Sequence, residues 1–376
     1  MQNSEKQDAP LNRPRIWALL GARTGDNQQV RALADALGWP VEEKLLDYSP
    51  LRGLPHFLIG KSLYTVKVPT RTQLHPPWPD IVIASGRRSV APARWIKQQS
   101  GHRAKLIQLG RPRAPLHLFD LVITTPQYGL PAADNVLSLS LPLQSPLDPN
   151  EKYLKCPFKE LSDKELSELP RPWTGVLIGG TTWPFILDSR AASALGGDIN
   201  RWIGTFGGSV LITTSPRSDP ELAESLGKIL KIPHFLDRWV AGSENSYKAI
   251  LQSADQMIVT ADSVSMLADT VRSGKPTAIW KTELRRDPFS NICRILGNQA
   301  HRSTPLGQLL RSAALIGLFT PPRHVERLTN AIVASKRASW FDPGRQIERP
   351  PDRSEDDDMG LAIRRVGALF NPFLSG

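Results

Sequence analysis

Residues 256–276 read QMIVTADSVSMLADTVRSGKP. The first five predict a buried strand, and Asp262–Ser273 predicts a helix that begins almost at once. A helix in this position presents the N–H groups of its first turn to an anion such as phosphate. Asp269 lies four residues after Ser265, so both are expected on one helical face. A carboxylate there accepts hydrogen bonds from ribose hydroxyls, or it belongs to a solvated acidic face.

Short apolar runs alternate with amphipathic stretches around this segment, from residue 175 to residue 280. Such alternation predicts a parallel β-sheet whose strands are joined by helices. Asp219 directly precedes one of these helices and is an expected N-cap. The predicted strands are 175–178, 209–213, 256–260 and 276–280, and the predicted helices are 189–206, 220–230, 262–273 and a short one ending at Ser253.

Residues 15–125 show the same alternation. One predicted helix has apolar residues at Val30, Leu33, Ala34 and Leu37, the spacing of a single helical face. The predicted strands are 15–20, 41–46, 81–84, 105–109 and 121–125, and the predicted helices are 28–37 and 90–99.

We therefore predict an α/β fold of two Rossmann-like domains that face a central cleft. Ligands of such sheets bind beyond the carboxyl ends of the strands, and a site between the domains follows. Prolines recur between the two halves and predict a linker. The predicted parts are a first domain at 1–140, the linker at 141–172, a second domain at 173–320, and a C-terminal helix with a charged tail at 321–376.

The chain has 376 residues, with 47 Lys and Arg against 36 Asp and Glu, and a formal net charge of +11. This excess indicates an anionic partner: nucleic acid, anionic lipid or a phosphorylated molecule. Nucleic acid is disfavoured because no RNA-recognition or helix-turn-helix signature occurs. Cys156 and Cys293 form no CxxC pair, which is typical of a reducing cytoplasm. Residues 1–14 have no apolar core, so a secretory signal is not expected.

Polar loops follow the predicted strands of the first half. Asp26 is a candidate general base, or it caps a helix. Arg87 and Arg88 precede a helix, where cations oppose the helix dipole; this favours a bound anion over a solvated basic helix start. The candidate acceptor or phosphate loops contain Arg23, Thr24, Gly25, Asn27 and Gln28, and Ser85, Gly86, Arg87 and Arg88.

The second half has loops of the same kind. Four hydroxyl side chains and Arg217 stand at the end of one strand (Thr213, Thr214, Ser215 and Ser218), a combination that holds a diphosphate or forms a capped turn. The seven histidines form no HxxxH or HxxE set, so we expect no metal site. The candidate donor-binding residues are Gly179, Gly180, Thr213, Thr214, Ser215, Arg217, Asp262, Ser263, Ser265, Met266 and Asp269.

The stretch Ser263–Pro276 resembles the donor-binding helix of GT-B glycosyltransferases, and Pro79–Arg88 resembles their acceptor-domain loop. That class includes the lipid-linked peptidoglycan N-acetylglucosamine transferase and the UDP-N-acetylglucosamine 2-epimerases. The order of five motifs resembles bacterial relatives of the plant "elongated mitochondria" family of mitochondrial fission, which are also described as glycosyltransferases. These motifs are Gly25–Gln28, Ser85–Arg88, Gly179-Gly180, Thr213–Ser215 and Thr260–Met266, within residues 15–335.

This resemblance implies a GT-B fold with the nucleotide-sugar donor on the C-terminal domain. It implies that Ser263, Ser265 and Met266 face the diphosphate. It also implies that Asp269 contacts the ribose, at a position where the GT-B pattern often has the longer Glu. The resemblance also implies a metal-independent reaction, with the nucleotide-diphosphate sugar as co-substrate and no further cofactor.

The function expected from these observations is glycosyl transfer from a nucleotide-diphosphate sugar to an unknown acceptor, such as a lipid-linked or cell-envelope glycan. We expect a cytoplasmic protein, with peripheral contact to the anionic inner face of the membrane. Two alternatives stay open. One is a nucleoside-diphosphate-sugar 2-epimerase of the same fold, and the other is a non-catalytic adaptor of the kind that the plant relatives' fission role indicates.

Overall fold

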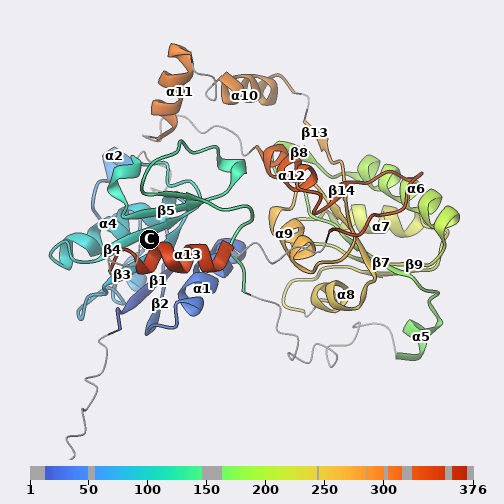
Figure 1. Cartoon of the computed structure of the whole chain (residues 1–376), viewed down its shortest axis with the longest axis horizontal. Helices are drawn as coiled ribbons and strands as arrows, with labels where there is room; N and C mark the ends of the chain where they lie inside the picture. Colours follow the sequence, from blue (N-terminus) through green and yellow to red (C-terminus); the bar gives the residue numbers. More distant parts are fainter. Residues whose placement is uncertain are drawn as a thin grey trace, which may run out of the picture.

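A computed structural model of the chain describes residues 13–49, 56–145, 163–243, 245–285, 287–299, 304–315, 324–351 and 358–370. These residues form two six-stranded β-sheets, one in each of two adjacent domains (Figure 1). A short antiparallel ribbon of β8 (Phe185–Ile186) and β13 (Glu283–Leu284) lies outside both sheets.

The first sheet has the strand order β2-β1-β3-β4-β5-β6, and all its neighbouring strands are parallel. The strand order reverses between β1 and β3, so this is the topological switch point at which such sheets bind ligands. The strands are β1 (Ile16–Leu20), β2 (Val41–Leu45), β3 (Ile81–Ser85), β4 (Lys105–Leu109), β5 (Leu121–Thr124) and β6 (Val136–Ser138). The helices are α1 (Thr24–Ala36), α2 (His56–Ile59), α3 (Val68–Arg71) and α4 (Val90–Gln99), with short 3₁₀ turns η2 (Arg87–Ser89), η3 (Leu116–Leu118) and η4 (Pro126–Tyr128).

The second sheet has the order β10-β9-β7-β11-β12-β14 and is also parallel throughout. Counted along the chain this is 3-2-1-4-5-6, the doubly wound order, with its switch point between β7 and β11. The strands are β7 (Trp173–Leu177), β9 (Ser209–Thr213), β10 (His234–Asp237), β11 (Gln256–Thr260), β12 (Thr277–Trp280) and β14 (Ser339–Trp340). The helices are α5 (Asp163–Glu168), α6 (Ser189–Phe206), α7 (Pro220–Ile229), α8 (Tyr247–Ser253), α9 (Val264–Arg272), α10 (Pro288–Gln299), α11 (Pro305–Leu315) and α12 (Val325–Ala334).

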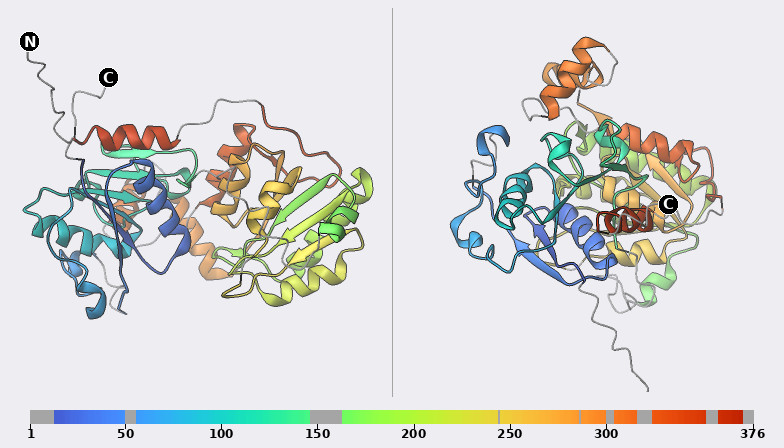
Figure 2. Two further views of the ribbon diagram at one scale, coloured as in Figure 1. Left: turned by 90° about the horizontal axis from the view of Figure 1, so that it is seen from below. Right: turned by 60° about the vertical axis from the view of Figure 1, so that its left-hand side comes forward.

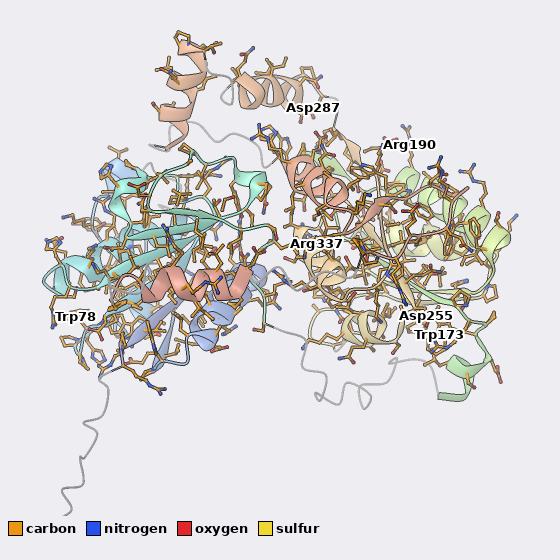
Figure 3. All side chains as sticks on the ribbon, in the orientation of Figure 1. Trp78, Trp173, Arg190, Asp255, Asp287 and Arg337 are labelled. Carbon is orange, nitrogen blue, oxygen red and sulfur yellow. The ribbon has the colours of Figure 1, made fainter. Side chains whose placement is uncertain are left out.

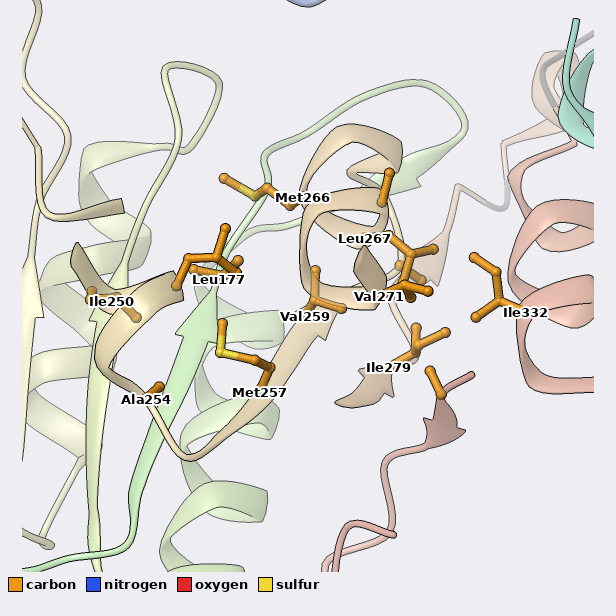
Figure 4. Packing of buried hydrophobic residues seen from close by; sticks show 14 of the residues in the cluster. Leu177, Ile250, Ala254, Met257, Val259, Met266, Leu267, Val271, Ile279 and Ile332 are labelled. Carbon is orange, nitrogen blue, oxygen red and sulfur yellow. The ribbon is translucent and has the colours of Figure 1, made fainter. Parts of the chain in front are cut away.

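Helices cover both faces of each sheet, and the central strands are therefore buried along their whole length. All residues of β1, β7 and β9 are buried, whereas the edge strand β2 is mostly exposed. Side chains of β11 alternate between the two faces: Met257 and Val259 pack toward α8 and α9, and Ile258 packs toward α6. Figure 4 shows the core that Met257 and Val259 join.

The predicted fold class of two Rossmann-like domains is confirmed by these two sheets. The helix predicted at 189–206 and the strand predicted at 209–213 coincide with α6 and β9. Asp219 caps α7, because its Oδ1 accepts a hydrogen bond from the Glu221 N–H at 3.0 Å. The helix predicted from Asp262 begins two residues later, since Ser263 keeps an extended backbone.

The C-terminal segment predicted at 321–376 divides between the two domains. Its first part, α12 and β14, belongs to the second domain, where Leu328 and Ile332 join the core and β14 pairs with β12. The helix α13 (Asp358–Gly367) instead lies on the first domain, and Ala362 and Val366 are fully buried against α1 and the first sheet. Figure 2 shows α13, in red, on the first domain. Of the predicted linker, residues 146–162 lie outside the described residues.

A narrow strap, residues 140–144, crosses between the domains. Arg272 on α9 donates to Gln144 Oε1 at 3.0 Å and to the Pro142 carbonyl at 2.5 Å. Arg337, labelled in Figure 3 at the domain boundary, donates to Ser140 Oγ at 3.1 Å. The same hydroxyl donates to the Asp358 carboxylate at 2.8 Å. These bonds join the strap to the second domain and to the start of α13.

The burial of α13 predicts that it stabilises the first domain. Replacing Val366 with Ala removes two buried methyl groups and should lower the free energy of unfolding by about 1–3 kcal/mol. Leu361→Ala on the same helix changes a side chain that is 36% exposed and should cost less than about 1 kcal/mol. Urea denaturation of both variants checks this. Equal losses would contradict the placement of α13.

Candidate functional site

The candidate donor-binding residues gather at the carboxyl edge of the second sheet, beside its switch point. Gly179 follows β7, and its N–H donates to Thr260 Oγ1 at the end of β11 at 2.9 Å. The next N–H, of Gly180, donates to Asp262 Oδ2 at 2.8 Å. The loops after β7 and β11 are therefore tied together at the switch point, where a doubly wound sheet binds its ligand.

Both glycines are required by close packing of these loops. A Cβ on Gly179 would lie 2.0 Å from Asp262 Oδ2, and a Cβ on Gly180 would lie 2.2 Å from the Arg217 carbonyl carbon. Real Cβ atoms do not approach other atoms so closely, so any larger residue would push the loops apart. The predicted glycine loop thus has a structural basis in contacts with Asp262 and Arg217.

The loop after β9 completes this group. Ser218 Oγ donates to the Gly179 carbonyl, and it also accepts the Ser215 N–H at 2.9 Å. The exposed Arg217 donates to Thr182 Oγ1 and, at 3.3 Å, to Ser263 Oγ. Arg217 therefore links the three loops at their surface. Thr213 and Thr214 are buried beneath Arg217. Thr214 Oγ1 accepts the Trp239 N–H at 2.9 Å and so supports the loop from below.

Asp262 is a buried carboxylate beneath this surface, with only 4% of its area exposed. Burial raises its pKa, while the Thr260 hydroxyl, the Gly180 N–H and the charge of Arg217 act in the opposite direction. Among the described residues, no donor reaches its second oxygen, Oδ1. The carboxyl group thus holds the Gly180 backbone beneath Arg217.

The N-terminus of α9 opens onto the same surface. Its N-cap residue is Ser263, whose side chain makes no capping hydrogen bond within the described part of the chain. By contrast, Asp188 and Asp219 cap α6 and α7 with their carboxylates. A helix start without a side-chain cap leaves N–H groups of its first turn for another acceptor. Together with the helix dipole, these groups favour an anion.

The first domain presents a matching helix start. Arg23, the N-cap residue of α1, makes no capping hydrogen bond among the described residues. The two helix starts meet, because a Cβ on Gly25 would lie 3.5 Å from Ser265 Oγ. The switch-point loops of both domains are thus in contact, and two positive helix ends are directed at one region.

Asp26 lies in the first turn of α1 and faces the loop after β3. Its Oδ2 is 3.9 Å from an Arg23 guanidinium nitrogen and would be 3.8 Å from a Cβ on Gly86. Asn27 next to it binds the backbone of Gly21, donating to the carbonyl at 2.6 Å and accepting the N–H at 2.8 Å. Asn27 therefore shapes the loop, while Asp26 remains half-buried at the domain boundary.

The remaining candidates of the first domain surround this point. Thr24 and Gln28 are exposed on α1, and Ser85 accepts the Ser89 hydroxyl through its carbonyl at 3.0 Å. Arg87 and Arg88 begin the turn η2, and partial burial lowers the pKa of the Arg87 guanidinium. An arginine remains protonated at neutral pH despite such a shift, so this loop brings positive charge to the switch point.

Two residues to which the family resemblance assigns ligand contacts, Met266 and Asp269, have side chains that contact other residues of the second domain. Met266 is 9% exposed and belongs to the core around Leu177, as Figure 4 shows. Asp269 accepts the Tyr247 hydroxyl at 2.6 Å through Oδ2. Burial raises the pKa of Asp269 to about 6, while Tyr247 and Arg272 act in the opposite direction. Of these two side chains, only Asp269 offers a polar atom to a ligand.

Sequence reasoning marked the hydroxyl of Ser218 but missed two participants in this arrangement, Thr182 and Tyr247. Thr182 stands within a loop that supplied other candidates, and its hydroxyl was the available signal. Tyr247 lies on α8, far along the chain from any glycine loop, and no local pattern marked it. The described residues contain no group of three or more His, Cys, Asp or Glu side chains suited to a metal ion. Within the same part of the chain, no helix is long and apolar enough to cross a membrane.

Close packing at Gly179 makes a clear prediction. Gly179→Ala should lower the free energy of unfolding by about 1–3 kcal/mol, because its methyl group overlaps the Asp262 carboxylate. Gly197→Ala is the matched control on α6, where a Cβ meets nothing within 4 Å. It should stabilise the helix by about 0.5–1 kcal/mol. Chemical denaturation distinguishes the two, and a neutral Gly179→Ala variant would contradict the packing argument.

Asp269 predicts a pH dependence of stability. Its pKa rises from 3.8 to about 6 on folding, so the folded state holds the proton more tightly between these values. The contribution of Asp269 to stability should therefore fall as the pH rises from about 4 to about 6. Relative to Asp269→Asn, the wild type should lose about 2–3 kcal/mol of unfolding free energy from pH 4 to pH 7. Parallel pH profiles of the two proteins would refute the shift.

The chain is similar to several solved structures and curated proteins. Staphylococcus aureus MnaA with UDP matches at 11% identity and a TM-score of 0.47, covering 95% of this chain and 97% of MnaA. Arabidopsis thaliana UGT89C1 with UDP-L-rhamnose matches at 11% identity and a TM-score of 0.48, covering 96% and 95% of the respective chains. At this sequence identity and TM-score, the similarity concerns the overall fold alone.

Sequence relatives give the family. An uncharacterized protein of Rickettsia prowazekii is 27% identical over 296 residues, which cover 70% of this chain and 82% of the relative. The Arabidopsis thaliana mitochondrial fission protein ELM1 is 26% identical over 227 residues, 54% of this chain and about half (51%) of the plant protein. The family model described as "Mitochondrial fission ELM1" matches residues 24–318, most of the chain. The chain therefore belongs to the mitochondrial fission ELM1 family.

Proposed function

We propose that the protein binds a nucleoside-diphosphate sugar between its domains and transfers the glycosyl group to an acceptor hydroxyl. The observation that carries this proposal is the meeting of two helix starts, α1 and α9, at Gly25 and Ser265. Helix N-termini without side-chain caps attract phosphate through both their N–H groups and the helix dipole. Arg217 adds a full positive charge beside Ser263.

A diphosphate seated at α9 has its partners on three loops. In the proposed site the N–H groups of Val264 and Ser265 donate to its oxygens, and the Ser263 hydroxyl adds a further bond. Arg217 is held in place by Thr182 and so is oriented before the ligand arrives. Such preorganised donors stabilise charge at little reorganisation cost. Asp269 has Oδ2 occupied by Tyr247, so contact with a ribose hydroxyl falls to its Oδ1.

The reaction that follows is a displacement at the anomeric carbon. The acceptor oxygen forms a bond to that carbon while the bond to the diphosphate oxygen breaks, and the leaving diphosphate takes the electron pair. Arg217 and the first turn of α9 stabilise the charge that develops on it. Asp26 takes the proton of the acceptor hydroxyl, from a half-buried position on the opposite domain.

Titration with nucleotides tests the binding half of the proposal. UDP, GDP and CMP sugars are added separately, and thermal unfolding of the full chain is measured. One of them should raise the melting temperature in a concentration-dependent way, because a ligand that binds only the folded state stabilises it. If none protects the protein, the proposed donor site is refuted.

Arg217 provides the sharper prediction. Arg217→Ala should weaken binding of the protecting nucleotide about tenfold or more, since it removes a charge-assisted contact to the diphosphate. Arg190→Ala is the matched control, with the same loss of charge at the start of α6, labelled in Figure 3. Calorimetric titration compares the two variants with the wild type. Equal affinity for Arg217→Ala and wild type would remove Arg217 from the site.

Turnover separates the transferase from its two alternatives. Glycosyl transfer predicts release of the nucleoside diphosphate only when an acceptor is present, and a slower release in Asp26→Asn. Conversion of the sugar without any acceptor would replace the proposal with a 2-epimerase. Tight nucleotide binding with no turnover on any acceptor would replace it with a non-catalytic adaptor.

A further inference from the structure

The helices α10 and α11 project from the body of the molecule, as Figure 1 and the right-hand view of Figure 2 show. They expose four large apolar side chains: Ile292 by 55%, Ile295 by 57%, Leu306 by 53% and Leu309 by 66%. In each helix the two apolar residues are three positions apart and therefore share a face. Apolar side chains gathered at helical spacing on a projecting element are typical of a contact surface.

The start of α10 is fixed to the second domain. Ser290 is buried there, its N–H donates to Asp287 Oδ1 at 2.9 Å, and its hydroxyl donates to Oδ2 at 2.7 Å. Trp183 donates to the same hydroxyl at 3.0 Å. Figure 3 labels Asp287 where α10 joins the domain. Trp183 directly follows Thr182, which holds Arg217, so the projecting helices are attached beside the candidate donor site.

The charge of this segment indicates what covers the apolar faces. Residues 285–324 contain six arginines, and Asp287 is the one acidic residue of this segment. A second copy of the chain would carry the same net positive charge in this segment, so like charges oppose self-association. An anionic lipid surface meets both requirements, because its headgroups attract arginine and its acyl boundary accepts Ile and Leu.

We propose that α10 and α11 dock the protein on an anionic lipid bilayer. The two helices lie in the interface with Ile292, Ile295, Leu306 and Leu309 inserted, and the net positive charge of residues 285–324 is attracted to the phosphate headgroups. This contact goes beyond the proposed function, because it needs neither a nucleotide nor a glycosyl acceptor.

Sedimentation of the full chain with lipid vesicles tests the proposal. The wild type should bind vesicles of equimolar phosphatidylcholine and phosphatidylglycerol, should bind pure phosphatidylcholine much more weakly, and should be released by high salt. Leu309→Asp should lower the partition coefficient about tenfold or more, since it removes an inserted side chain and adds a repelled charge. Leu45→Asp is the matched control, because this leucine is 58% exposed at the end of β2. It should bind like the wild type.

Thermal unfolding of both variants establishes that they are folded. The proposal is overturned if the wild type does not bind the anionic vesicles, or if Leu309→Asp and Leu45→Asp bind equally well. It is also overturned if the wild type forms a concentration-dependent dimer that Leu309→Asp abolishes while vesicle binding stays unchanged, because the apolar faces then meet a second copy.

Discussion

The second domain's ligand edge depends on the contact between the Gly179-Gly180 backbone and the side chains after β11. Both glycine N–H groups are used internally, by Thr260 and Asp262. They are therefore not the anion-binding groups that a glycine loop leads one to expect. Their effect is indirect: they draw the loop after β7 against the β11–α9 turn, so that the N-terminus of α9 is the element that faces outward.

Burying the Asp262 carboxyl group costs free energy, and its neighbours offset part of that cost. Burial removes the hydration of this carboxyl group, which is why its pKa is raised. The Arg217 charge, the Gly180 N–H and the Thr260 hydroxyl recover part of this loss. The arrangement also ties Arg217 electrostatically to the carboxylate below it, while Thr182 and Ser263 hold its guanidinium group from the sides. A rigidly placed arginine loses little entropy on meeting a phosphate.

The sequence predicted most of the architecture, because parallel strands buried on both faces leave continuous apolar runs. It missed β6 and β14, which are short, and β10, whose apolar pair Phe235-Leu236 is flanked by His234 and Asp237. It did not predict the helix α13, whose buried residues Ala362 and Val366 follow a charged segment. At the site, the sequence pattern identified the loops that directly follow strands. It did not identify the contact of Asp269 with Tyr247, because these residues lie on different helices, α9 and α8, and meet only in the folded structure.

The helix α9 of the second domain contacts both the first domain and the strap between the domains. Its N-terminus meets the first domain at Gly25, and Arg272 near its C-terminus binds the strap at Pro142 and Gln144. A helix of nine residues is about 13 Å long and behaves as a rigid rod. The facing N-termini of α1 and α9 each present a positive helix-dipole end, and Asp26 in the first turn of α1 offsets part of that charge. The helix α9 therefore spans the distance from the strap to the contact with the α1 turn that carries Asp26.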